Sequence, residues 1–83
     1  MTREEVLERI REHLATELEI EPSRITEATR FKEDLEADSL DLVELVMGLE
    51  ERFDVSIPEE DLEGVATVGQ AVDLVLKKAD EKT

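Results

Sequence analysis

Apolar residues at intervals of three or four indicate that the first part of the chain is helical. The apolar face consists of Leu7, Ile10, Leu14 and Leu18. Val6 lies on its flank, and this spacing places the side chains on one side of an α-helix. Thr2 and Glu5 are typical of a capping box at the start, and Pro22 disfavours helical geometry at the residue before it. The pattern predicts a first helix over about residues 3–20.

Three further helical patterns follow. The second begins at Ser39 and covers residues 39–53. A short third helix over residues 58–63 starts at Pro58, because proline is favoured at a first helical position. A fourth helix over residues 67–79 opens with a Thr–Gln capping signal and carries valines at helical spacing. With no strand pattern anywhere, the predicted fold is all-α, a small four-helix bundle of three longer helices and one short helix.

A long loop is expected between the first two helices. It runs over the sixteen residues from Pro22 to Ala37, with Ile25, Phe31 and Leu35 as isolated apolar anchors. We expect a single helical turn after Pro22. A loop of this length inside a compact domain favours a functional role over a plain connection. The chain has no repeat and no low-complexity linker, so a single domain over residues 1–83 is expected.

The second predicted helix carries two apolar stripes when it is wrapped at about 100° per residue. The wider, core-facing stripe consists of Leu42, Leu45, Val46, Leu49 and Phe53. The second stripe consists of Leu40, Val43 and Met47. Either this helix is central and buried on two sides, or the second stripe is an exposed partner surface. The flanking acids Glu44, Glu50 and Glu51 favour a partner surface, because a charged rim around apolar anchors steers a partner into place.

The composition is strongly acidic. With 24 Asp and Glu against 10 Lys and Arg, the formal net charge is −14. Such a field repels nucleic acid and anionic lipid surfaces and favours basic partners. No apolar run approaches the roughly 20 residues of a membrane span, the N-terminal segment lacks a signal-peptide pattern, and cysteine is absent. These features predict a soluble, cytoplasmic protein, which we expect to be a monomer.

Ser39 stands out because it lies at the start of the second predicted helix. Its simplest role is structural, since Asp38 and Ser39 are both residue types favoured at an N-cap. A catalytic serine needs a base, but the only histidine, His13, lies in another helix, and no G-x-S-x-G motif is present. The acids Asp34, Glu36 and Asp38 do not form a calcium loop, which needs glycine and glutamate at its sixth and twelfth positions. We therefore predict no catalytic residue and no metal site, and a serine that other proteins modify.

The sequence around Ser39 resembles a known family. The resemblance covers Phe31 to Asp61, FKEDLEADSLDLVELVMGLEERFDVSIPEED, and is to acyl carrier proteins of the bacterial-type, dissociated fatty acid synthase. The D-S-L motif is short, but D-S-L-D-x-V-E-L-V-M followed by L-E-E-x-F and I-P-E-E is highly specific. The segment TVGQAVDLV extends the similarity over nearly the whole chain.

The resemblance implies that a phosphopantetheinyl transferase, using magnesium, attaches 4′-phosphopantetheine from coenzyme A to Ser39. The thiol of this arm would carry growing fatty acyl chains as thioesters, which the bundle can enclose. The protein would be a carrier without a catalytic site of its own, and fatty acid synthase enzymes with basic patches would dock on its second helix. Asp38 would adjoin the attachment site. The residues that match the family's partner contacts are Leu40, Asp41, Val43, Glu44, Met47, Glu50 and Glu51.

Three positions depart from the family pattern, and at one of them Leu42 is bulkier and more apolar than many members of the family. Glu36 stands where glycine is usual; it costs stability if the site requires a positive φ, or else it adds one more charge to the docking surface. Gly48 stands inside the second helix, where alanine is common. Two alternative functions also remain: a specialised carrier for a polyketide or other lipid pathway, and an acidic adaptor without an arm. The adaptor would bind helices or basic surfaces through Leu40, Val43 and Met47, and Ser39→Ala would leave its function intact.

Overall fold

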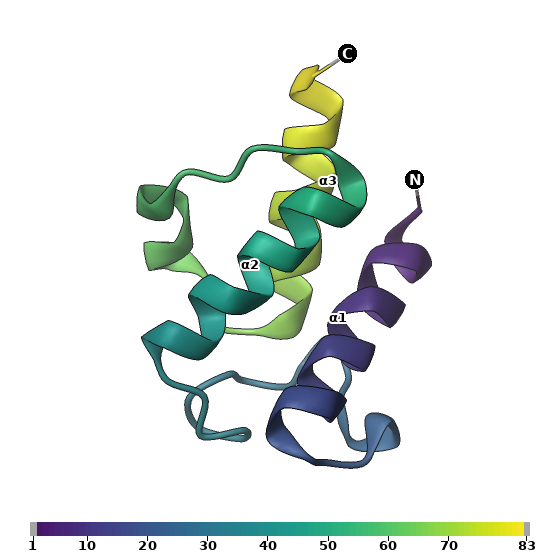
Figure 1. Cartoon of the computed structure of the whole chain (residues 1–83), viewed down its shortest axis with the longest axis vertical. Helices are drawn as coiled ribbons and strands as arrows, with labels where there is room; N and C mark the ends of the chain where they lie inside the picture. Colours follow the sequence, from purple (N-terminus) through teal and green to yellow (C-terminus); the bar gives the residue numbers. More distant parts are fainter. Residues whose placement is uncertain (1, 83) are drawn as a thin grey trace.

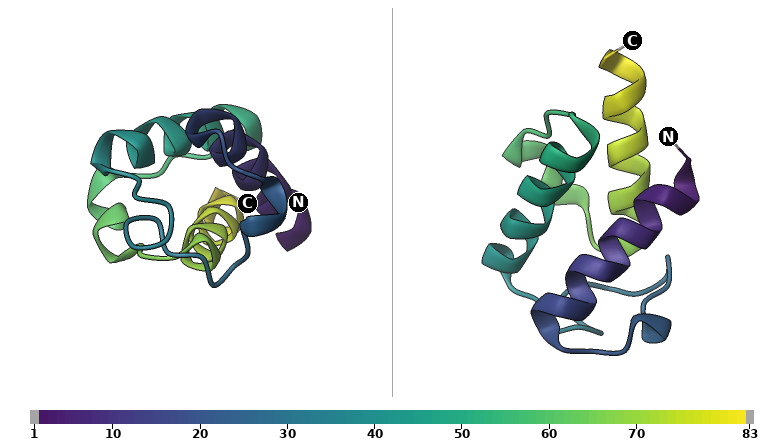
Figure 2. Two further views of the ribbon diagram at one scale, coloured as in Figure 1. Left: turned by 90° about the horizontal axis from the view of Figure 1, so that it is seen from below. Right: turned by 45° about the vertical axis from the view of Figure 1, so that its right-hand side comes forward.

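The computed structural model describes residues 2–82, which form three long helices and two short 3₁₀ helices (Figure 1). In chain order these are α1 (Arg3–Leu18), η1 (Pro22–Arg24), α2 (Ser39–Phe53), η2 (Glu59–Gly64) and α3 (Val68–Lys82). The three long helices pack against one another, and η2 lies on the side away from α1 (Figure 2). Within the described residues the only β-type pairing is an isolated bridge. The predicted all-α bundle of three longer helices and one short helix is confirmed, and η1 is the expected turn in the loop.

α1 starts as predicted and ends earlier than predicted. The hydroxyl of Thr2 accepts a hydrogen bond from the N–H of Glu5 at 3.2 Å and so caps the first turn. The helix ends at Leu18, because Glu19 adopts a left-handed conformation (φ 53°, ψ 48°) and its N–H donates to the carbonyl of Ala15. The expectation that the proline segment further along ends this helix is therefore wrong.

The last two helices also begin at identifiable caps. η2 is a 3₁₀ helix that starts at Glu59, because Pro58 takes an extended conformation (φ −61°, ψ 146°) as its N-cap. The expectation that Pro58 is the first helical residue is therefore wrong. α3 follows a reciprocal pair of hydrogen bonds, in which Gln70 N–H donates to the Thr67 hydroxyl at 3.2 Å and Thr67 N–H donates to Gln70 Oε1 at 3.0 Å. This is the predicted capping signal. α3 then continues to Lys82, beyond the predicted limit at residue 79, and none of the helices within the described residues is long and apolar enough to cross a membrane.

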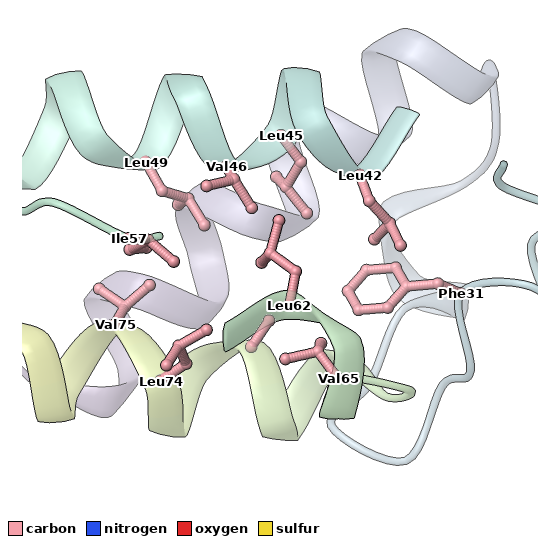
Figure 3. Close-up of a pocket in the computed structure, with 11 residues that line it drawn as sticks. Phe31, Leu42, Leu45, Val46, Leu49, Ile57, Leu62, Val65, Leu74 and Val75 are labelled. Atoms are coloured by element: carbon pink, nitrogen blue, oxygen red, sulfur yellow. The ribbon is translucent and has the colours of Figure 1, made fainter. Parts of the chain in front are cut away.

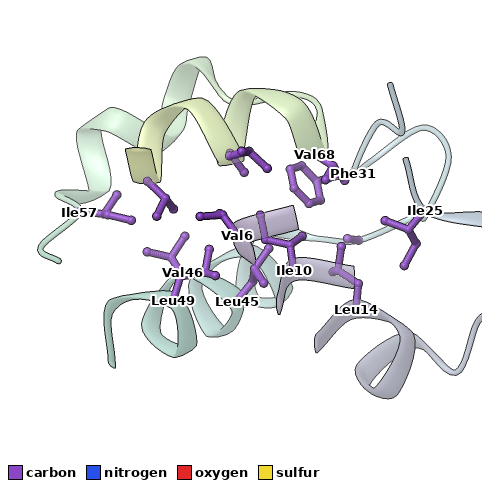
Figure 4. Close-up of a cluster of buried hydrophobic side chains, with 14 of the residues drawn as sticks. Val6, Ile10, Leu14, Ile25, Phe31, Leu45, Val46, Leu49, Ile57 and Val68 are labelled. Carbon is purple, nitrogen blue, oxygen red and sulfur yellow. The ribbon is translucent and has the colours of Figure 1, made fainter. Parts of the chain in front are cut away.

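The core combines side chains from every long helix and from the loop (Figure 4). The largest fully buried side chains belong to Val6, Ile10, Leu14, Ile25, Phe31, Leu45, Leu49, Val68, Val72 and Val75. On α1 the buried residues are spaced by four, so Val6 is the first residue of the buried row, whereas Leu7 and Leu18 are only partly buried. The expectation that Val6 lies on the flank is wrong. Contacts of α1 with both α2 and α3 select the row that is buried.

The core-facing stripe of α2 is buried at its centre and open at its ends. Leu45, Val46 and Leu49 are buried, while Leu42 and Phe53 are partly buried against the core. α2 itself has the predicted bounds. Its periodicity therefore identified both the helix and its inward face.

Backbone hydrogen bonds connect the loop between α1 and α2 to the start of α3. The N–H of Val68 donates to the carbonyl of Thr29 at 2.9 Å, and the N–H of Gly69 donates to the carbonyl of Glu27 at 2.9 Å. The N–H of Phe31 donates at 3.0 Å to a carbonyl in the segment before α3. These bonds hold the Phe31 ring in the core and make the loop an ordered part of the fold.

Two helical glycines are expected to respond in opposite ways to alanine. A Cβ on Gly48 lies 3.7 Å from Nδ1 of His13, an ordinary contact, so Gly48→Ala should stabilise the protein by about 1 kcal/mol through helix propensity. A Cβ on Gly69 lies 3.0 Å from the carbonyl oxygen of Glu27, so Gly69→Ala must displace the loop and should destabilise the protein. Urea unfolding followed by circular dichroism measures both changes. If both substitutions change the free energy of unfolding in the same direction, the two glycines do not differ as this prediction requires.

Candidate functional site

The start of α2 is held by a reciprocal capping box. The N–H of Asp41 donates to Oδ1 of Asp38 at 3.0 Å, and the N–H of Asp38 donates to Oδ2 of Asp41 at 3.1 Å. Asp38 is thus the N-cap, and Ser39 is the first helical residue. The Ser39 side chain is exposed and makes no hydrogen bond to the described residues. Its hydroxyl is therefore free for reaction with an external group.

The turn before α2 places Glu36 in a strained conformation. Its φ of 55° lies in the left-handed region, which non-glycine residues rarely adopt. The turn forms as the N–H of Ala37 donates to the carbonyl of Phe31 at 2.8 Å. Nearby, the backbone N–H of Arg30 donates to Oδ2 of Asp34 at 2.8 Å. This hydrogen bond, together with those from the Arg30 guanidinium, holds the pKa of the Asp34 carboxyl below its ordinary value. The position does require a positive φ, which explains why glycine suits it.

The second stripe of α2 lies at the surface. Leu40 is 63% exposed and Met47 is 57% exposed, and these are the exposed large hydrophobic residues of the described chain. Val43 between them is partly buried. Glu44 and Glu51 are exposed on the same helix. We call these five residues the α2 surface; it is an apolar patch with acids beside it, and the alternative of a helix buried on two sides does not hold for Leu40 and Met47.

Two acids predicted to contact partners also make internal hydrogen bonds. Asp41 completes the capping box, and Glu50 is half-buried, with its Oε2 accepting a hydrogen bond from the N–H of Ile57 at 2.8 Å. Glu50 therefore holds the loop that follows α2. This role has no signal in the sequence, because a hydrogen bond between residues seven apart across a chain reversal leaves no periodic pattern. The acid three residues after Asp38 is a signal that could have revealed the capping box.

A narrow apolar cavity lies between α2, η2 and α3 (Figure 3). Hydrocarbon side chains line it, and Leu62 projects into its middle from η2. Its volume is about 10 Å³, close to the minimum that a single water molecule needs. Phe31 and Leu42 lie at one end, and Leu42 is three residues, or nearly one helical turn, from Ser39. An apolar ligand near Ser39 can enter this cavity only if its walls move apart.

His13 is not placed to act on Ser39. Its ring packs against Gly48, which lies nine residues along α2 from Ser39, or about 14 Å at 1.5 Å per residue. Its Nε2 is buried and makes no hydrogen bond to the described residues. Within residues 2–82 there is also no group of three or more His, Asp or Glu side chains that could hold a metal ion. The arrangement of His13 therefore does not supply the base that a serine nucleophile needs.

Comparison with known proteins agrees with this arrangement. Residues 8–75 match the family described as the phosphopantetheine attachment site. The chain is 52% identical over 77 residues to an acyl carrier protein of Rubrobacter xylanophilus, an alignment that covers 93% of this chain and 95% of the relative. The fold is similar to that of the acyl carrier protein from Enterococcus faecalis, with a TM-score of 0.79 and 40% identity over 94% of this chain and 99% of that chain. For the acyl carrier protein of Thermotoga maritima the TM-score is 0.84 at 28% identity, over 98% and 94% of the two chains.

The chain therefore belongs to the phosphopantetheine attachment family and, within it, to the acyl carrier proteins. The resemblance seen in the sequence is confirmed, and 4′-phosphopantetheine is the prosthetic group of the family. The relatives found are acyl carrier proteins. A carrier of this kind needs an exposed attachment point, a surface for partners and room for an acyl chain.

The start of α2 fits this prosthetic group. A phosphodiester on the Ser39 hydroxyl would lie at the N-terminus of a fifteen-residue helix, where unpaired N–H groups and the helix dipole stabilise negative charge. Asp38 and Asp41 already bind two N–H groups there and add negative charge of their own. They disfavour a tightly bound anion, so an attached arm is expected to extend from the protein and move freely.

Replacing Glu36 by glycine is expected to stabilise the protein by about 1 kcal/mol. A left-handed conformation costs a non-glycine residue roughly 1–2 kcal/mol, which exceeds the entropic cost of glycine. Glu36→Gln removes the same charge and keeps the strain, so it is the matched control. Thermal and urea unfolding of the three proteins measure the difference. An equal gain from glutamine would show that charge, and not backbone strain, limits stability here.

Proposed function

We propose that Ser39 is the residue that receives the 4′-phosphopantetheine arm, on which the protein carries fatty acyl chains as thioesters. The observation that supports this most directly is the capping box, because Asp38 takes the structural role and leaves the Ser39 hydroxyl exposed and unpaired. In the transfer the serine oxygen forms a bond to the arm's phosphorus, and the bond from that phosphorus to the adenosine bisphosphate half of coenzyme A breaks. The serine proton passes to a base of the transferase, whose magnesium offsets the acids around Ser39.

The α2 surface is proposed as the site where partner enzymes dock. Leu40 and Met47 are anchors of the kind that contribute affinity at the centre of an interface. Glu44 and Glu51 lie at the rim, where charge speeds association with basic patches. A patch with only two exposed anchors suits a protein that must leave each partner quickly. The phosphopantetheinyl transferase and the synthase enzymes are the expected partners, and the net charge of −14 favours a monomer because it makes copies repel one another.

The apolar cavity is proposed as the place where the acyl chain is enclosed. Its hydrocarbon lining matches the chemistry of a saturated chain, and one end lies nearly one helical turn from the proposed attachment point. The volume of about 10 Å³ shows that no space is kept open for cargo. The chain must therefore displace a wall as it enters. Each buried methylene contributes about 0.8 kcal/mol toward that displacement.

Mass spectrometry of the intact protein tests the attachment point. After incubation with coenzyme A, magnesium and a broad-specificity phosphopantetheinyl transferase, the wild type is expected to gain the mass of one arm and Ser39→Ala is expected to gain none. Ser23→Ala and Ser56→Ala remove the other two serines, both exposed, and should be modified as the wild type is.

The same experiment distinguishes a carrier from an adaptor without an arm. If the wild type gains no mass while a known carrier is modified in the same tube, the carrier function is refuted. The exposed Leu40 and Met47 would then support the adaptor. A gain that persists in Ser39→Ala would instead refute the choice of residue.

Charge and apolar contacts on the α2 surface are expected to affect different steps of docking. Glu44→Gln and Glu51→Gln should each slow association with the transferase roughly twofold at low salt, because rim charges act mainly on the association rate. Met47→Ala should mainly speed dissociation. Glu17→Gln removes an exposed acid from α1 and is the control. Stopped-flow binding at two salt concentrations measures these rates, and equal slowing by Glu17→Gln would show that net charge alone directs the encounter.

A further inference from the structure

An ion pair joins α3 to η2 beside the apolar cavity. Nζ of Lys78 lies 2.9 Å from Oδ2 of Asp61, and the two side chains are 18% and 34% exposed. Glu81, one turn further along α3, lies 3.4 Å from the same ammonium group. The hydrogen bond to Asp61 is the main reason that the pKa of Lys78 is raised above its ordinary value, so the ammonium is charged at neutral pH. The ion pair links a core helix to the short helix packed outside it.

Both partners adjoin residues that line the cavity. Asp61 directly precedes Leu62, whose side chain projects into the cavity (Figure 3). On α3, Lys78 follows Leu74 by four residues and Val75 by three, so the three residues lie on neighbouring positions of the helix surface. Leu74 and Val75 both line the cavity. The ion pair therefore lies along the cavity wall, where η2 meets α3.

η2 is the wall with the least support. It is a six-residue 3₁₀ helix without a side-chain cap, and hydrogen bonds in such helices have poorer geometry than those of an α-helix. The other two walls carry fully buried side chains, such as Leu45 of α2 and Val75 of α3, each 1% exposed. Leu62 of η2 is only partly buried. Displacing η2 therefore disturbs less close packing than displacing α2 or α3.

We propose that the Lys78–Asp61 ion pair holds η2 against α3 and so determines the length of acyl chain that the bundle encloses. This rests on the proposed function, in which the acyl chain enters the cavity. Each methylene that becomes buried favours enclosure by about fourfold. Deeper entry of the acyl chain moves η2 outward and separates Lys78 from Asp61. The loss of this ion pair opposes further entry. Enclosure stops where another methylene no longer outweighs the loss of the ion pair, so the two residues position the cargo and do not touch the reacting thioester.

The test compares acyl forms of the protein that differ only in chain length. The arm is loaded with saturated chains from butanoyl to dodecanoyl, and the melting temperature of each acyl form is compared with that of the unacylated holo-protein. An enclosed chain binds only the folded state and raises this temperature. In the wild type the melting temperature is expected to rise with chain length up to a certain length and then to stay constant. In Lys78→Gln and Asp61→Asn it should level off about one methylene later, because the roughly two- to fivefold contribution of a partly exposed ion pair is close to the gain of about fourfold per methylene. A purely structural role would instead lower every form alike.

Matched variants isolate the ion pair from its charges. Lys77→Gln and Glu60→Gln make the same charge changes at exposed neighbours and should keep the wild-type length. The double variant of Lys78 and Asp61 should behave as either single variant does, because one interaction is lost in each case. Hydrogen exchange gives a readout without cargo. The Val65 N–H, which donates to a carbonyl of η2 at 3.0 Å, should exchange roughly two- to fivefold faster in the pair variants, the range that partly exposed ion pairs give.

Three results would overturn the proposal. If the melting temperature of acylated Lys78→Gln and Asp61→Asn stops rising at the same chain length as in the wild type, the ion pair does not set cargo length. An unchanged exchange rate at Val65 would show that it does not hold η2. If the wild type accepts no arm, the proposed function fails and this proposal fails with it. Intact mass detects that failure before any chain length is compared, so the two failures are distinguishable.

Discussion

The functional end of the molecule depends on the reciprocal hydrogen bonds between Asp38 and Asp41. They make Ser39 the first residue of α2, and because the helix repeats every 3.6 residues, every later side chain has a fixed direction relative to Ser39. Leu45 then faces the core, while Leu40 and Met47 face solvent. One local constraint thus sets where Ser39 lies relative to the apolar patch and the buried face of α2.

Acidic residues occupy positions where the backbone favours glycine. The non-glycine residues with a positive φ within the described chain are Glu19, Glu36 and Asp54. Glu19 and Asp54 end α1 and α2, where glycine is the usual C-terminal residue of a helix. Each acid adds to the net charge of −14 and to the field that attracts basic partners. The same residues lower stability through strain and self-repulsion, so the sequence favours encounter with partners over maximal stability.

The packing separates a rigid part of the molecule from a compliant part. α1, α2, α3 and the loop around Phe31 share fully buried side chains, and backbone hydrogen bonds join that loop to the start of α3. η2 contributes only partly buried side chains to the cavity. A carrier benefits from this division, because an empty hydrophobic hole is costly in a folded protein. A closed cavity with one weakly held wall avoids that cost, and it is the arrangement that the proposed enclosure of an acyl chain requires.

The sequence by itself predicted the helices, the bounds of α2 and the serine proposed as the attachment point, because spacing, capping residues and a specific motif are local signals. Periodicity also separated two stripes on α2, but only the packing of α1 and α3 decided which one is covered. In the same way, contacts from two sides buried Val6 more deeply than Leu7. The bond from Glu50 to the N–H of Ile57 and the ion pair between Lys78 and Asp61 required the tertiary structure. Each joins elements that only chain reversal brings together, and no local propensity encodes such a contact.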